Sequence, residues 1–87
     1  MLRDDYLMRM IRQLANALAR ISGLRQAGQL DQAEEELDAS LAALGVDPRL
    51  VGAADTAFLL SLVQDPARRE ALARLLAERD DIRAARA

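Results

Sequence analysis

The chain has 87 residues, which is enough for one domain, and it contains no Cys, His or Lys. The absence of Cys excludes disulfides, thiolate nucleophiles and cysteine zinc sites, and the net charge of −2 gives no general attraction to nucleic acid or an anionic membrane. Leu and Ala dominate, and only Tyr6 and Phe58 are aromatic, so the sequence predicts an all-α domain of about five helices over residues 1–87.

The first helix is predicted to cover about residues 4–27, with Asp4 or Asp5 as its cap. Apolar residues recur at three- and four-residue spacing and form one stripe that we expect to face the core: Leu7, Met10, Ile11, Leu14, Leu18 and Ile21. Gly23 lies inside this helix. Either the helix bends there or another helix packs closely over it, and we favour the close packing.

The second helix is predicted over about residues 31–44, after a left-handed Gly28 that ends the first helix. The short link demands an antiparallel hairpin. Residues 1–30 contain five Arg and two Asp, whereas residues 31–45 contain five acids and no base. We interpret this as mutual compensation between the two neighbouring helices. An acidic patch that faces a partner is the alternative.

Two Asp-Pro pairs, at Asp47 and Asp65, mark helix starts, because Asp caps free amides and Pro suits the first helical position. The first pair predicts a short turn of helix, and the second predicts a C-terminal helix over about residues 66–83. Between them, Asp55 is predicted to cap a helix over residues 56–64.

Residues 17–48 resemble a tetratricopeptide-type helical hairpin. The resemblance is carried by Gly28, Leu30, Ala33, Leu37, Ser40 and Leu41, followed by Asp47 and Pro48. Ala17 departs from the repeat, which prefers Trp there. The resemblance implies a helical scaffold of the kind that binds proteins. A peptide groove needs about three such repeats, and one is visible.

A second resemblance, to a family of small uncharacterised bacterial helical proteins, covers most of the chain. It is carried by Arg3-Asp4-Asp5-Tyr6-Leu7-Met8-Arg9-Met10-Ile11 and by Ala19-Arg20-Ile21-x-Gly23-Leu24-Arg25-x-x-Gly28. The resemblance implies an all-α fold and a bacterial origin, and no activity comes with it. It draws attention to the opening segment, where polar groups gather.

We expect no catalytic residue, cofactor or metal. General acid–base catalysis normally uses His, Lys or a tuned carboxylate. Glu34, Glu35 and Glu36 are adjacent on a helix that we expect to be solvated. Carboxylates at i,i+4 on that helix could hold Mg²⁺ or Ca²⁺ weakly, but a true site needs more oxygen ligands.

The predicted function is a non-catalytic protein–protein interaction or scaffolding module, for which a homodimer is one form. The candidate partner-binding residues are Tyr6, Arg9, Arg12, Glu34 and Glu35. Four apolar residues motivate the homodimer, since we do not expect one small core to absorb them all: Leu2, Leu50, Val51 and Leu59. We expect Met10 in the core and Tyr6 over the edge of the last helix, with a partner contact as the alternative.

The alternative function is a nucleic-acid-associated regulatory protein that uses the Arg-rich first helix. The acidic second helix and the two aromatic residues argue against it, because base stacking needs aromatic platforms. We predict a cytoplasmic protein, since no apolar run reaches the length of a membrane span and the acidic start is not typical of a signal peptide.

Overall fold

A computed structural model describes the backbone of residues 2–87 and the side chains of residues 5–87. These residues form five α-helices and no strand, so the predicted all-α fold is confirmed. The helices are α1 (Leu2–Gln26), α2 (Leu30–Ala43), α3 (Pro48–Val51), α4 (Thr56–Ser61) and α5 (Pro66–Arg86).

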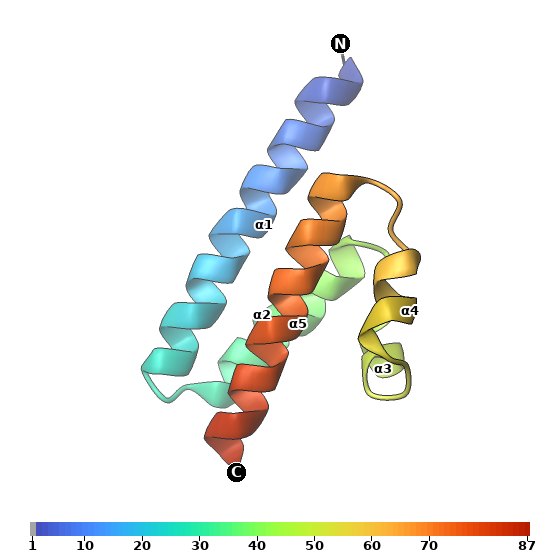
Figure 1. Ribbon diagram of the computed structural model, residues 1–87. Coiled ribbons are helices and arrows are strands. Elements are labelled where there is room, and N and C mark those ends of the chain that lie inside the picture. The colour runs from blue at the N-terminus through green and yellow to red at the C-terminus, as the bar shows by residue number, and fades with distance from the viewer. Residues whose placement is uncertain (1) are drawn as a thin grey trace.

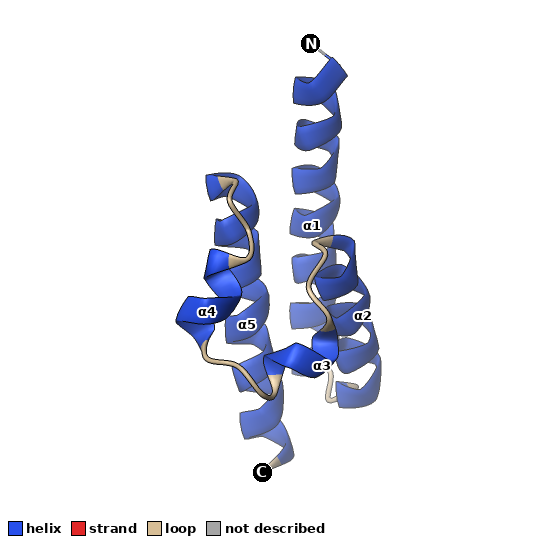
Figure 2. Cartoon of the chain, turned by 90° about the vertical axis from the view of Figure 1, so that its right-hand side faces the viewer, coloured by secondary structure: helices blue, strands red, loops and turns tan. Residues whose placement is uncertain are grey.

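The three long helices pack side by side (Figure 1). α1 and α2 form the predicted antiparallel hairpin, and α5 runs beside both in the direction of α1. The two short helices connect α2 to α5, with α3 against α2 and α4 against α5 (Figure 2). The molecule is elongated, with principal extents of 44 × 26 × 15 Å.

Asp side chains start the last three helices as predicted. Asp47 accepts a hydrogen bond from the Arg49 backbone N–H at 2.9 Å, and Asp55 accepts one from the Phe58 N–H at 2.8 Å. Asp65 accepts one from the Ala67 N–H at 2.7 Å. Each carboxylate satisfies an amide that has no partner within its helix, so these three starts are locally determined.

Some predicted boundaries are wrong. α1 already begins at Leu2, so Asp4 and Asp5 lie inside the helix and not in front of it. α5 continues to Arg86 and not to residue 83, and its last-turn Arg side chains suit the negative end of the helix dipole. α2 begins at Leu30, one residue early, and α4 ends at Ser61, short of residue 64.

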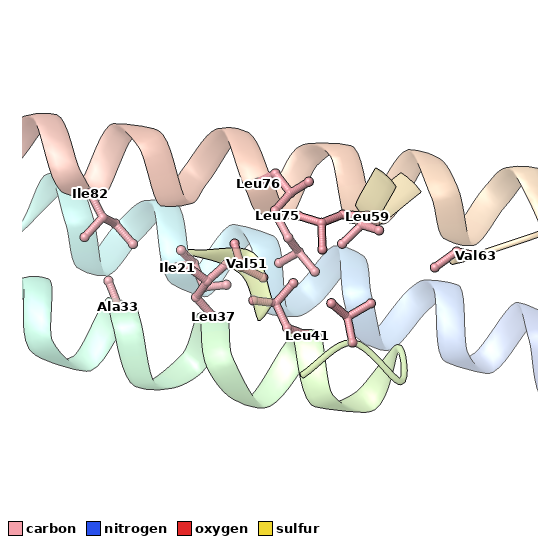
Figure 3. Close-up of a cluster of buried hydrophobic side chains, with 12 residues drawn as sticks. Ile21, Ala33, Leu37, Leu41, Val51, Leu59, Val63, Leu75, Leu76 and Ile82 are labelled. Carbon is pink, nitrogen blue, oxygen red and sulfur yellow. The ribbon is translucent and has the colours of Figure 1, made fainter. Parts of the chain in front are cut away.

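The hydrophobic core lies between α1, α2 and α5 and is closed by the α3–α4 connection (Figure 3). Its fully buried members include Ile21, Leu37, Leu72 and Leu75. Among the described side chains of α1, Ile21 belongs to this cluster, and Leu18 and Leu24 pack against it. The core therefore engages mainly the second half of α1.

The two glycines at the helix ends have the positive φ that their turns require, +79° at Gly28 and +82° at Gly45. Gly23 is different. It is exposed, and a Cβ added there would meet nothing within 4 Å, so the close packing predicted over Gly23 is wrong.

The reason given for a homodimer also needs correction. Val51 and Leu59 are buried within the core, so they supply no free apolar surface. Leu50 is 44% exposed, and the side chain of Leu2 lies outside the described residues.

Candidate functional site

The first part of α1, residues 2–13, extends past the ends of α2 and α5 (Figures 1 and 2) except at its last turn, where Met10 lines a cleft with Ala43 and Ile11 lines one with Ala67. We call it the projecting segment. At 1.5 Å per residue it is about 18 Å long. Leu7, Met10 and Ile11 are partly exposed and lie outside the core cluster, so the prediction that Met10 is a core residue is wrong. They nevertheless occupy the predicted stripe.

Tyr6 and Arg9 lie together on this segment. With Met10 and Gln13 they line a shallow cleft of about 240 Å³ formed by α1 alone. Tyr6 is 59% exposed. The expectation that Tyr6 covers the last helix is therefore not met, and its ring is available at the surface.

Two clefts flank the base of the projecting segment. The cleft between α1 and α5 has a volume of about 230 Å³ and an apolar lining of Ile11, Leu14, Ala15, Leu18, Ala67 and Ala71. The cleft between α1 and α2 has a volume of about 300 Å³, and its lining includes Met10, Leu14, Ala17, Ala39 and Ala43. Small Ala side chains on α2 and α5 leave both clefts open.

Ion pairs close the rims of these clefts. At the α1–α2 cleft, the Arg20 guanidinium donates to Glu36 at 2.7 Å. At the α1–α5 cleft, Arg74 donates to Glu70 at 3.1 Å. Each ion pair has no net charge, so neither pair adds a net charge to the edge of its cleft.

Charge compensation runs mainly through α5, which corrects the predicted exchange between the first two helices. Arg20–Glu36 is the direct α1–α2 pair among the described side chains. Arg25 of α1 instead donates to Glu78 at 3.0 Å, and that hydrogen bond raises the pKa of the Arg25 guanidinium. Arg86, near the end of α5, donates to two carboxylates of α2, Asp31 at 2.7 Å and Glu34 at 2.8 Å.

The candidate residues separate into two groups. Tyr6, Arg9 and Arg12 lie on the projecting segment, at the amino-terminal end of the molecule. Glu34 lies toward the opposite end, where it is engaged by Arg86, and Glu35 is exposed one residue further along α2. The structure therefore brings the first three together and leaves the two glutamates apart from them.

On the acidic face of α2, the surroundings of Asp38 change the pKa of its carboxyl. Partial burial raises the pKa of Asp38, Glu34 raises it further, and Arg79 opposes the shift. Within residues 5–87, no three acidic side chains gather closely enough to hold a metal ion. None of the helices described over residues 2–87 combines the length and apolar character needed to cross a membrane.

Sequence reasoning missed the pair Phe58 and Leu62 as surface features. Among the side chains of residues 5–87, Met8 is the most exposed of the large apolar residues, at 63%. Phe58 and Leu62, four residues apart at α4, are also exposed, while Leu59 and Val63 face the core. Helical spacing alone could have separated Phe58 and Leu62 from Leu59 and Val63.

No family model, curated protein or solved structure matches the chain in these comparisons. The two resemblances in the sequence therefore stay predictions.

Proposed function

We propose that the chain is a non-catalytic protein–protein interaction module that contacts its partner with the projecting segment of α1. The observation that carries the proposal is the partly exposed apolar stripe Leu7, Met10 and Ile11, which lies outside the core cluster and reaches the two open clefts beside α2 and α5. Apolar surface of this kind, rimmed by polar groups, typically marks a docking site.

The side chains around the stripe suit a contact between proteins. Tyr and Arg are enriched in the cores of interfaces, and Met adapts its shape to a partner surface. Tyr6, Met8 and Arg9 bring these three residue types to one short stretch of helix. The open clefts at its base add concave surface next to the convex stripe.

Nucleic-acid binding has less support. Two of the Arg side chains on α1 already hold carboxylates, Arg20 with Glu36 and Arg25 with Glu78. This leaves Arg9 and Arg12, within the described side chains, as the basic groups of the projecting segment, which is a small footprint for phosphate contacts.

The experiment follows trace amounts of fluorescently labelled chain by sedimentation velocity, in lysate of the source cells and in concentrated purified chain. We expect faster sedimentation in at least one of them. The double variant Leu7→Ser/Ile11→Ser should abolish the shift. The matched control Phe58→Ser/Leu62→Ser removes an equally apolar pair from α4 and should keep it.

Circular dichroism shows that each variant is folded. Unchanged sedimentation of the natural chain in both media would overturn the proposal, and so would a shift that survives Leu7→Ser/Ile11→Ser. If the shift disappears after nuclease treatment, the partner is nucleic acid and not a protein.

A further inference from the structure

We infer that the partner of the projecting segment is a second copy of this chain, whose own α1 packs antiparallel against it about a two-fold axis near Ile11. The inference rests on the proposed function and names the occupant of the same surface. It is carried by the shape, the charge and the area of that surface.

The surface is self-complementary in shape. Its apolar stripe begins at Leu7 and runs into a concave cleft between α1 and α5, whose lining starts at Ile11. When two α1 helices run antiparallel and cross near Ile11, the stripe of each copy lies opposite the cleft of the other. Leu7 then lies opposite the cleft residue Ala15. A closed two-fold dimer uses the same patch on both subunits in this way.

The cleft has the lining that an incoming helix needs. Ala67 and Ala71 lie four residues apart on one face of α5, and Ala15 faces them from α1. Short side chains at these positions permit interaxial distances at the close end of the usual 8–10 Å range, about 8 Å. Leu14 and Leu18 supply apolar contact along the α1 side of the cleft.

The charge distribution favours a second copy over a partner selected by charge. Successive helical residues are about 100° apart, so Arg9 and Arg12 lie on the far side of α1 from Leu7 and Ile11. The stripe itself is uncharged, and the nearby rim groups Glu70 and Arg74 neutralise each other. Two identical α1 helices can therefore meet without placing like charges across the contact.

The surface area fits the burial of one such contact. The chain exposes 5852 Å², whereas size scaling for compact monomers gives about 5,000 Å² at its mass of 9.5 kDa. An interface of standard size takes about 800 Å² from each partner, so a chain with this excess of about 800 Å² has enough surface for one such contact. The radius of gyration, 12.9 Å against about 12 Å expected, shows the same extension.

The test is sedimentation equilibrium of the purified full-length chain from micromolar to millimolar concentration. We expect a mass of twice 9.5 kDa at the upper end. Ile11→Glu places a charge at the centre of the contact and should keep the chain monomeric throughout. The matched control Phe58→Glu places the same charge on exposed α4 and should dimerise like the natural chain.

Disulfide cross-linking tests the direction of pairing with variants that keep the fold, because the chain has no cysteine of its own. Ile11→Cys should form a cross-linked dimer on oxidation, since facing Cα atoms near a two-fold axis come within disulfide range. Leu7→Cys alone should remain uncross-linked, whereas an equimolar mixture of Leu7→Cys and Ala15→Cys should cross-link between the two variants.

A chain that stays monomeric at all concentrations overturns the inference. A dimer that survives Ile11→Glu, or one that cross-links through Leu7→Cys alone, overturns the antiparallel arrangement. Failure of the dimer can be distinguished from failure of the proposed function. If the chain is monomeric but still sediments faster in lysate, and the shift needs Leu7 and Ile11, the proposed function holds and the partner is a different protein.

Discussion

The two halves of α1 carry the same apolar spacing in different surroundings. In residues 14–26, the stripe is covered by α2 and α5, and Ile21 is fully buried. In residues 2–13, the same stripe lies outside the core cluster. The comparison teaches that helical periodicity reports which side of a helix is apolar, while the length of the neighbouring helices decides how far that side is covered.

The largest expected difference between the two halves of α1 appears when the same type of side chain is truncated in each. Ile21→Ala leaves a cavity in the core and should lower the free energy of unfolding by about 2–5 kcal/mol. Ile11→Ala, measured in dilute solution, should lower it by less than about 1 kcal/mol. Urea denaturation followed by circular dichroism measures both, and equal losses would show that the projecting segment belongs to the core.

Gly23 and Gly28, which lie within and just after the covered half of α1, should respond oppositely to the same substitution. Gly28 has φ +79°, so Gly28→Ala forces a side chain into the left-handed region and should destabilise the fold by about 1–2 kcal/mol. Gly23 lies in regular helix with free space around it, so Gly23→Ala should stabilise the fold by about 0.5–1 kcal/mol. Thermal unfolding should shift in opposite directions. A lower melting temperature for Gly23→Ala would contradict the open surroundings of that residue.

The starts of α1 and α5 offer the next contrast. Asp65 caps α5 through the Ala67 and Arg68 amides, and Asp65→Ala should lower the free energy of unfolding by about 1 kcal/mol. Asp5 lies within the exposed projecting segment, so Asp5→Ala should have less than half that effect. Denaturant titration of the two variants measures how much each helix start contributes to the free energy of unfolding. Similar losses would mean that the first turn of α1 contributes to stability as α5 does.

The smallest expected effect is the loss of stability at acidic pH that Asp47 causes at the start of α3. The Arg49 guanidinium and backbone N–H hold the pKa of Asp47 below its usual value. A folded pKa below the unfolded one adds stability above the unfolded pKa, and this is lost as the pH falls through the folded pKa. The decline should begin below about pH 4.

A pH series of urea midpoints measures this decline. Asp47→Asn keeps a capping oxygen but cannot titrate, so its midpoint should fall less steeply between neutral and acidic pH than that of the natural chain. Parallel curves would show that Asp47 contributes nothing to the acid response.

Much of the local structure followed from short-range chemistry. Asp47, Asp55 and Asp65 act on amides two or three residues away, and Gly28 and Gly45 adopt the φ that a helix end requires, so each could be predicted without tertiary information. The wrong start of α2 occurs where Gln29 precedes the helix and makes no side-chain hydrogen bond to its first amides.

The candidate site was predictable in part. The sequence placed Tyr6, Arg9 and Arg12 in one opening segment, and the structure keeps them together there. It could not show that Glu34 is held by Arg86, because the two residues are 52 apart in the chain. Ion pairs of that separation depend on how α5 lies beside α2.

The sequence by itself determined the all-α class, the helical hairpin and most helix starts, because these depend on spacing and on hydrogen bonds within a few residues. Tertiary structure alone decided which part of the α1 stripe is buried. That choice depends on where α2 ends and α5 begins relative to α1, which the periodicity of a single helix does not encode. The uncovered remainder is the surface from which we argue function.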